Sequence, residues 1–169
     1  MEVQYKFVLL GDAETGKTTF LSVFFYDRFL TEYEHTIGAA YMGKDIENET
    51  CRLKANFWDT SGNPRYHCLA RMYYRDANAC IIFYDITNSE SFTNAKFYIQ
   101  EVRNSNPNAI FFVLGNKADL IEKRAVAFDE AKKYFTDLGI SFWEISCKNS
   151  SMITETMNLI AFKVTNSNS

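Results

Sequence analysis

The stretch of the sequence that decides the expected fold is Gly11-Asp12-Ala13-Glu14-Thr15-Gly16-Lys17-Thr18. It matches the pattern G-x-x-x-x-G-K-[ST], in which glycines let successive backbone amides turn toward an anion. The apolar run 6–10 precedes it, and the segment 17–29, whose apolar residues have helical spacing, follows it. The stretch therefore lies between a predicted strand and a predicted helix, which is the context that a phosphate-binding loop requires. A plain glycine-rich turn is the alternative, and this context disfavours it.

Apolar runs alternate with helical patterns along the rest of the chain, without a linker or an internal repeat. Further strands are predicted at 41–48, 51–58, 79–84, 110–114 and 141–145, with a hairpin turn around Asn48-Glu49. Helices are predicted at 65–75, 91–104, 128–138 and 151–163, and Ser91 or Asn94 is the expected N-cap of the second one. This alternation predicts an α/β fold with a mostly parallel sheet, in which ligands bind at the carboxyl ends of the strands.

Length and composition fit one globular domain. The chain has 169 residues, of which 47% are hydrophobic, enough for a single sizeable core. We expect this domain to span residues 1–165 and to be followed by a disordered polar tail at 166–169. The net charge of −3 gives no basic excess for a nucleic-acid partner, and the four cysteines match no zinc or redox motif. No stretch approaches the roughly 20 apolar residues of a membrane helix, so we expect a cytoplasmic protein.

The phosphate-binding loop carries the first candidate contacts. Lys17 would reach the β- and γ-phosphates of a nucleotide, and the Thr18 hydroxyl would ligate Mg²⁺. The start of the following helix adds the positive end of its dipole. The candidate contacts to phosphate are Ala13, Glu14, Thr15, Gly16, Lys17, Thr18 and Thr19. This motif indicates a nucleoside triphosphate but leaves the base open, and a kinase that transfers phosphate to a small substrate also fits it.

A second motif, Trp58-Asp59-Thr60-Ser61-Gly62, follows the third predicted strand. Asp59 at the strand end can hold Mg²⁺ through water, and the Gly62 amide can sense whether a γ-phosphate is present. Asp and Gly are common in turns, so this D-x-x-G pattern is a weak signal by itself. Its position directly after a predicted strand makes it stronger.

The base is indicated by Gly115-Asn116-Lys117-Ala118-Asp119, which follows the run 110–114. The Asp119 carboxylate can accept two hydrogen bonds from guanine, one from N1–H and one from the exocyclic amine, whereas adenine offers no such donor pair. The Lys117 stem can lie across the purine face while Asn116 ties loops together. After the last predicted strand, Ser146-Cys147-Lys148 can place a backbone amide near guanine O6. The four motifs occur in order, each after a predicted strand, and this conjunction is the strong signal.

With these motifs in order, the chain resembles the small GTPases of the Ras superfamily over essentially its whole length, and most of all the Rab branch. The Rab-like segments are His35-Thr36-Ile37-Gly38, Trp58-Asp59-Thr60, Tyr73-Tyr74-Arg75-Asp76-Ala77, Tyr84-Asp85-Ile86-Thr87 and Glu90-Ser91-Phe92. The resemblance implies a P-loop NTPase small G domain, with a six-stranded, mostly parallel sheet flanked by five helices. It also implies a GTP/GDP-binding switch that hydrolyses GTP slowly and regulates vesicle traffic.

The resemblance assigns further roles to individual residues. Thr36 would close onto Mg²⁺ and the γ-phosphate, Tyr33 would cover the phosphates, and Phe29 would pack edge-on against guanine. From its own surroundings in the sequence, Phe29 is instead an ordinary core aromatic at a helix end. The metal ligands would be Thr18, Thr36 and Asp59, and the residues acting in hydrolysis would be Lys17, Thr36 and Asn63. Effectors, exchange factors and GTPase-activating proteins would bind the segments from Ile37 to Tyr41 and from Asn63 to Arg75.

The sequence departs from the family pattern at the second switch, where Asn63-Pro64 stands in place of the usual Gln-Glu. The Gln orients the attacking water, and Asn63 carries the same amide on a stem one methylene shorter, so we expect weak hydrolysis. Pro64 either stiffens this loop or begins the next helix as its first residue. Glu14 adds a carboxylate near the polyphosphate. If its side chain points inward, repulsion would speed GDP release, and if it points to water, screening would leave GDP release nearly unchanged.

Two alternatives to a working GTPase stay open, and the first of them follows from these departures. A nucleotide-bound scaffold that hydrolyses essentially nothing fits Asn63, Pro64 and Glu14. The kinase alternative fits residues 11–18 only, and Asn116-Lys117-Ala118-Asp119 disfavours it. No cysteine follows Cys147, so these residues do not support the prenylated membrane attachment that is usual in Rab proteins.

Overall fold

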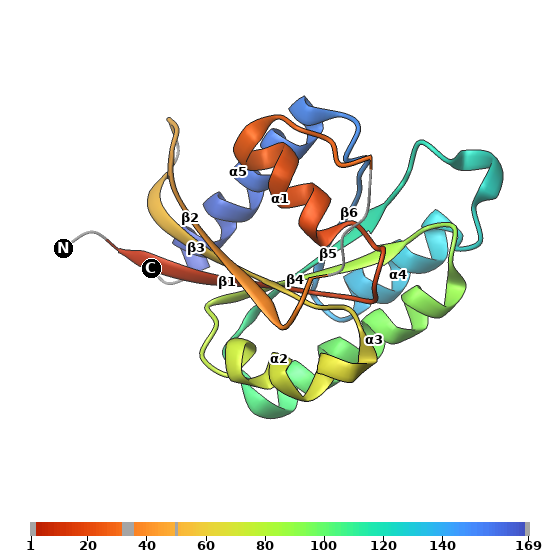
Figure 1. Ribbon diagram of the computed structural model, residues 1–169, viewed down its shortest axis with the longest axis horizontal. Helices are drawn as coiled ribbons and strands as arrows, with labels where there is room; N and C mark the ends of the chain where they lie inside the picture. Colours follow the sequence, from red (N-terminus) through yellow and green to blue (C-terminus); the bar gives the residue numbers. More distant parts are fainter. Residues whose placement is uncertain (1–2, 32–35, 50, 168–169) are drawn as a thin grey trace.

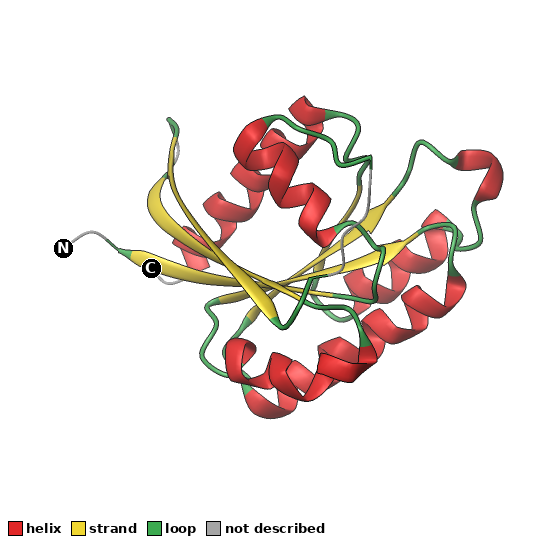
Figure 2. Cartoon of the chain, in the orientation of Figure 1, coloured by secondary structure: helices red, strands yellow, loops and turns green. Residues whose placement is uncertain are grey.

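The computed structural model describes residues 3–31, 36–49 and 51–167, which form one six-stranded sheet with helices on both faces (Figures 1 and 2). The strands are β1 (Gln4–Leu10), β2 (Ala39–Glu47), β3 (Arg52–Thr60), β4 (Ala79–Asp85), β5 (Ile110–Asn116) and β6 (Ser141–Glu144). The α-helices of these residues are α1 (Lys17–Tyr26), α2 (His67–Tyr74), α3 (Ser89–Ser105), α4 (Phe128–Asp137) and α5 (Ser150–Ser167). Two short 3₁₀ helices, η1 (Pro64–Tyr66) and η2 (Ile121–Lys123), lie in connecting segments. The predicted α/β fold, with six strands and five helices, is confirmed.

The strand order, β2-β3-β1-β4-β5-β6, brings the motif-bearing loops to one edge of the sheet. All neighbouring pairs are parallel except β2 and β3, which form the predicted antiparallel hairpin. The hairpin turn is held by Asn48, whose backbone N–H donates to Cys51 O and whose Oδ1 accepts from Cys51 N, both at 3.0 Å. Because β1, β3, β4, β5 and β6 run in the same direction, their carboxyl ends meet at the same edge.

Two hydrophobic cores, one on each face of the sheet, follow from the alternation of side chains along the strands. In β1, Phe7 and Leu9 belong to the core that α1 and α5 cover, while Val8 and Leu10 belong to the core beneath α2, α3 and α4. All four side chains are at most 1% exposed. Figure 1 shows the same division, with α1 and α5 above the sheet and α2 and α3 below it. Because side chains on both faces of the central strands are buried, the sequences of these strands are unbroken apolar runs.

Two helix ends differ from the sequence prediction. Helix α1 ends at Tyr26 and not at Phe29, because Asp27 takes a left-handed conformation (φ 54°) and its N–H bonds the carbonyls of Ser22 and Val23. This releases Phe29 from the helix. At the other end of the chain, α5 continues to Ser167, so residues 166 and 167 of the predicted disordered tail are helical. Residues 168–169 lie outside the described residues.

The N-cap of α3 also differs from the prediction, because it is Asn88 and neither Ser91 nor Asn94. The Asn88 Oδ1 accepts from the backbone N–H of Glu90 at 3.0 Å and of Ser91 at 3.2 Å. The segment is rich in residues that can cap, so local preference could not select among them. A contact with the end of β4 selects the N-cap. Ser91 Oγ accepts from Asp85 N at 2.9 Å, and this hydrogen bond fixes Ser91 inside the first helical turn. Among the described helices, none has the length and apolarity needed to cross a membrane.

We predict that Asn88→Ala lowers the free energy of unfolding by about 1 kcal/mol, because two amides at the start of α3 lose their acceptor. The measurement is denaturant-induced unfolding. Ser89→Ala is the matched control: it removes a small polar group from the next, exposed position, and we expect a change within about 0.5 kcal/mol. Equal stabilities for the two variants would contradict the assignment of Asn88 as the cap.

Candidate functional site

The candidate site is a cavity of about 400 Å³ at the carboxyl edge of the sheet. Its walls come from the phosphate-binding loop, the first turn of α1, the segment after α1, the end of β5 and the loops after β5 and β6. The lining residues are Glu14, Gly16, Thr19, Phe29, Leu30, Asn116, Lys117, Asp119, Leu120, Ser146, Cys147 and Lys148. A second, narrower pocket adjoins it and is lined by Glu14, Gly16, Lys17, Thr18, Thr36, Thr60 and Gly62. Together the two pockets contain most of the residues that the sequence singled out.

The phosphate-binding loop is packed so closely that two of its positions have room only for glycine. A Cβ at Gly11 would lie 2.5 Å from the carbonyl oxygen of Phe83, and one at Gly16 would lie 2.0 Å from Asn116 Nδ2. Both glycines also have positive φ angles, 146° and 98°. Glu14 has a φ of 64°, unusual for a residue with a side chain, and it is exposed at the rim of both pockets.

Lys17 is buried at the base of the loop and 5% exposed. Its Nζ donates to the carbonyl oxygens of Gly11 and Asp12, both at 2.8 Å. Burial lowers the pKa of Lys17 to about 8, although the negative charges of Asp59 and then Asp12 work to raise it. The loop therefore holds a partly desolvated cation where the backbone amides of a phosphate-binding loop converge.

The three side chains predicted as metal ligands lie in contact with one another, and two of them, Thr18 and Thr36, line the narrower pocket. Thr18 Oγ1 donates to Asp59 Oδ2 at 2.6 Å and lies 3.0 Å from Thr36 Oγ1. The second carboxylate oxygen, Asp59 Oδ1, is buried without a hydrogen-bond partner. Burial raises the pKa of Asp59, against the hydrogen bond from Thr18 and the charge of Lys17. A buried acceptor without a donor is a costly arrangement that a bound cation would relieve.

These oxygens fit Mg²⁺ in particular. Mg²⁺ prefers oxygen ligands and is usually held by one or two carboxylates together with phosphate oxygens and water. The described residues contain no group of three or more His, Cys, Asp or Glu side chains that could hold a metal ion by themselves. The site therefore suits a metal that arrives with a polyphosphate and completes its coordination with phosphate oxygens.

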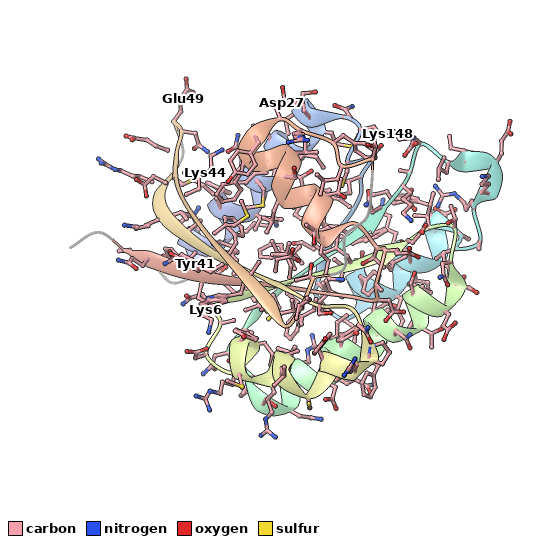
Figure 3. All side chains as sticks on the ribbon, viewed as in Figure 1. Lys6, Asp27, Tyr41, Lys44, Glu49 and Lys148 are labelled. Atoms are coloured by element: carbon pink, nitrogen blue, oxygen red, sulfur yellow. The ribbon has the colours of Figure 1, made fainter. Side chains whose placement is uncertain are left out.

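The far end of the cavity presents the Asp119 carboxylate. Ser146 Oγ donates to Asp119 Oδ1 at 2.9 Å, and Lys148 Nζ lies 3.3 Å from Asp119 Oδ2. Partial burial works to raise the pKa of Asp119, but these hydrogen bonds outweigh it and the pKa is lowered. Asp119 is therefore ionised at neutral pH, and each of its oxygens keeps a lone pair for a ligand. Lys148, labelled in Figure 3, also lies over the Phe29 ring, at 5.8 Å from its centroid.

Asn116 and Cys147 connect the two ends of the site. Asn116 Nδ2 donates to the Thr15 carbonyl at 3.0 Å, which ties the loop after β5 to the phosphate-binding loop as predicted. Its Oδ1 is buried without a partner. Cys147 is buried with its Sγ 4.0 Å from Gly16 O, and burial raises its pKa to about 12. The thiol is therefore protonated and unreactive at neutral pH, and it acts as a small packing group.

The second switch loop packs directly on the phosphate-binding loop. A Cβ at Gly62 would lie 2.2 Å from the backbone nitrogen of Ala13. The following residue, Asn63, is the N-cap of η1, and its Oδ1 accepts from Arg65 N at 3.0 Å. Pro64 is the first residue of η1, which answers the question left open by the sequence. In this arrangement the amide oxygen expected to orient water is engaged by the backbone.

The structure brings nearly all of the predicted residues together, and it adds some that the sequence did not indicate. Leu30 and Leu120 line the cavity, and Phe29, 41% exposed, lines it too and is not a core residue. Lys117 forms an ion pair of 2.6 Å with Asp85, which was not among the expected contacts. The sequence feature that could have indicated a role for Asp85 in the site is its carboxylate at the end of an apolar strand. Tyr33 lies in residues 32–35, outside the described residues.

Comparison with known proteins agrees with the geometry of this site. A model of the Ras family matches residues 6–166 of the chain. Ras-related protein Rab5A of Oryza sativa subsp. japonica is 44% identical over 157 residues, covering 92% of this chain and 77% of the relative. The proteins of this family bind guanine nucleotides, generally together with Mg²⁺. The chain therefore belongs to the Ras family, in which it is a Rab-like small GTPase.

Proposed function

We propose that the chain is a GTP/GDP switch that hydrolyses GTP slowly and, in its GTP form, recruits partner proteins in vesicle traffic at endomembrane surfaces. The observation that carries this proposal is the convergence of Thr18, Thr36 and Asp59 beside the buried Lys17. Each of the three comes from a different segment, and one of them, Thr36, is not anchored in a helix or strand. A ligand that binds all three would couple the position of that segment to its own presence.

The metal and phosphate contacts follow from this convergence. Thr18, Thr36 and Asp59 would hold Mg²⁺, directly or through water, and the bound ion would offset the negative charge that develops on the phosphate oxygens. Lys17 would donate to the β- and γ-phosphates in place of its present bonds to backbone carbonyls. The backbone amides of residues 13–19 and the start of α1 would complete the cradle.

The switch itself depends on two loops that would both contact the γ-phosphate. Thr36 precedes β2, and Gly62 follows β3, against the backbone of Ala13. With a γ-phosphate present, Thr36 and the Gly62 amide each gain a ligand. Hydrolysis removes that ligand, so both loops lose a contact at the same time.

Slow hydrolysis is supported by the state of Asn63. Its side chain is one methylene shorter than Gln, and its Oδ1 is already bonded to the Arg65 amide. To orient a water molecule, Asn63 would have to leave its place as the cap of η1. A second candidate function, a nucleotide-bound scaffold without turnover, is favoured by the same hydrogen bond.

The proposed partner surface spans the segments from Ile37 to Tyr41 and from Asn63 to Arg75. It contains exposed apolar side chains, including Ile37 at 79%, Met72 at 58% and Tyr41 at 54%. The rings of Tyr41 and Trp58 are 5.2 Å apart, and those of Trp58 and Tyr73 are 5.0 Å apart. This row links β2, β3 and α2, with Tyr41 labelled in Figure 3. Its aromatic side chains would supply rigid contact area for a partner that distinguishes the two states.

We predict that Asn63→Gln raises the rate of GTP hydrolysis by up to about 100-fold, because the longer stem lets the amide reach the attacking water. The measurement is single-turnover phosphate release from protein loaded with Mg²⁺·GTP. Asn63→Ala, which removes the amide and the cap together, is the control and should be no faster than the wild type. If GTP loads but neither wild type nor Asn63→Gln turns it over, the scaffold becomes the better interpretation.

We predict that Asp119→Asn lowers the affinity for GDP by about 100-fold or more and improves binding of xanthosine diphosphate. The carboxamide turns one acceptor into a donor, which opposes the guanine amine but matches the C2 carbonyl of xanthine. Equilibrium titration with both nucleotides measures the change. Asp129→Asn makes the same substitution on the exposed first turn of α4 and should leave both affinities unchanged. An unaltered preference in Asp119→Asn would exclude Asp119 from base recognition.

We predict that GDP binding takes up about three quarters of a proton at pH 8.5 and less than about 0.2 at pH 7. Before binding, burial lowers the pKa of Lys17 to about 8, so much of it is neutral at pH 8.5, and the phosphates restore the charged form. Calorimetry in pairs of buffers with different ionisation enthalpies gives the net uptake, to which the proton fraction that the GDP phosphate itself releases on binding is added back. Lys17→Arg stays charged and should show no such difference. Equal uptake by the wild type at both pH values would contradict the lowered pKa.

A further inference from the structure

Asp85 is a buried carboxylate at the end of β4 that the proposed nucleotide contacts leave unused. It is 7% exposed and pairs in register with Asn116 at the end of β5. Asp85 Oδ1 accepts from both the backbone N–H and the Oγ1 of Thr87, at 2.8 and 2.7 Å. Its other oxygen, Oδ2, lies 2.6 Å from Lys117 Nζ. The two oxygens of Asp85 therefore have different partners: Oδ1 closes a local turn with Thr87, and Oδ2 binds the ammonium group of Lys117 from the neighbouring loop.

Lys117 is fixed both at its backbone and at the ammonium group of its side chain. Its backbone has a φ of 66°, its carbonyl accepts from Leu120 N at 2.9 Å, and the next amide, Ala118 N, donates to Ile145 O at 3.0 Å. At the other end, Asp85 holds the ammonium group. Among the described residues that line the 400 Å³ cavity, Lys117 is present and Asp85 is absent. Lys117 is therefore part of the cavity wall, and its ammonium group is bound by a carboxylate that is not part of that wall.

We propose that Asp85 is a positioning residue for nucleotide binding: it holds the Lys117 stem in place as a flat apolar wall for the purine ring. This inference rests on the proposed function, because it presumes that the cavity takes the base of a guanine nucleotide. Asp85 touches no part of the base and acts through Lys117 alone. Asp119 selects guanine, whereas the Asp85–Lys117 pair makes the wall rigid for any purine.

The entropy cost of ordering the Lys117 side chain, compared with the small stability that the ion pair supplies, favours positioning of Lys117 as the role of this pair. A lysine side chain has four rotatable bonds, and ordering it at the moment of ligand binding lowers affinity. The pair fixes those bonds beforehand, so the protein binds the base with its wall already formed. The stability gained from such a half-buried pair is small, because the loss of hydration offsets most of the charge attraction. The side chains are only 10% and 33% exposed, so salt screens this attraction weakly and the anchor persists at physiological ionic strength.

A single substitution can remove the ion pair between Asp85 and Lys117 and keep the hydrogen bonds from Thr87 to residue 85. Asp85→Asn keeps an oxygen to accept from Thr87, and it replaces the charged oxygen that faces Lys117 by an NH₂ group, which cannot accept from the ammonium. A structural role of Asp85 in the turn would be preserved in this variant, whereas a positioning role would be lost. Lys117→Met provides the complementary change, because it keeps an unbranched apolar stem and removes the group that Asp85 holds.

The experiment measures the dissociation of a fluorescent GDP analogue and of the matching inosine diphosphate analogue from the full chain with Mg²⁺. We expect Asp85→Asn to release both about 10-fold faster, and by the same factor, because the wall contacts the ring and not the exocyclic amine. In the Lys117→Met background, Asp85→Asn should bring no further acceleration. Asp76→Asn, which removes the carboxylate paired with Lys6 at the other end of the sheet, is the matched control and should release GDP at the wild-type rate.

Each other outcome overturns a distinct claim. If the wild type does not retain the GDP analogue, the proposed function fails and the inference fails with it. If the wild type retains GDP and Asp85→Asn releases it at the same rate, only the positioning role is wrong. Acceleration that persists in the Lys117→Met background would show that Asp85 acts by another route, and a changed ratio between the guanine and inosine analogues would show that it acts on base selection.

Discussion

The close approach of neighbouring segments to the phosphate-binding loop is the constraint on which the rest of the site depends. A Cβ at Gly11, Gly16 or Gly62 would lie within 2.5 Å of an atom from another segment. At these contacts β4, the end of β5 and the second switch loop each come against the same eight-residue loop. A side chain at any of them would push the loops apart and separate groups that must meet around one ligand. The loop is thus the common reference to which every other part of the site is aligned.

Electrostatics in the site follow from that close packing. Lys17 and Asp59 are both buried, and desolvation shifts the pKa of each toward its neutral form. Each restrains the shift of the other, and Thr18 gives Asp59 a further hydrogen bond. A cation beside Asp59 and an anion beside Lys17 would complete the arrangement, which is the charge pattern of a metal–polyphosphate complex. At the base end the balance is opposite, because hydrogen bonds lower the pKa of Asp119 and keep it charged.

In the second switch loop, Asn63 and Pro64 have a local structural role that bears on the proposed hydrolysis. Asn63 and Pro64 suit the start of a short 3₁₀ helix, since one caps it and the other is its first residue. The local structure is therefore well satisfied by these residues. The catalytic requirement is different: an amide that serves as a cap is not available to orient water. In the proposed function, the cap of η1 and the orientation of water would compete for the Asn63 side chain.

The sequence by itself determined the architecture and most of the site, because both depend on local patterns. Apolar runs define the strands, the motifs follow the strand ends, and parallel strands place their carboxyl ends at one edge, so Lys17, Asp59 and Asp119 had to converge. Tertiary structure decided what local preference left open: the end of α1 at Tyr26, the capping of α3 by Asn88, and Pro64 as the start of η1. It alone paired Asp85 with Lys117, because the two are 32 positions apart and meet only where β4 and β5 lie side by side. Contacts of that kind are set by how the strands pack, and no spacing within the sequence encodes them.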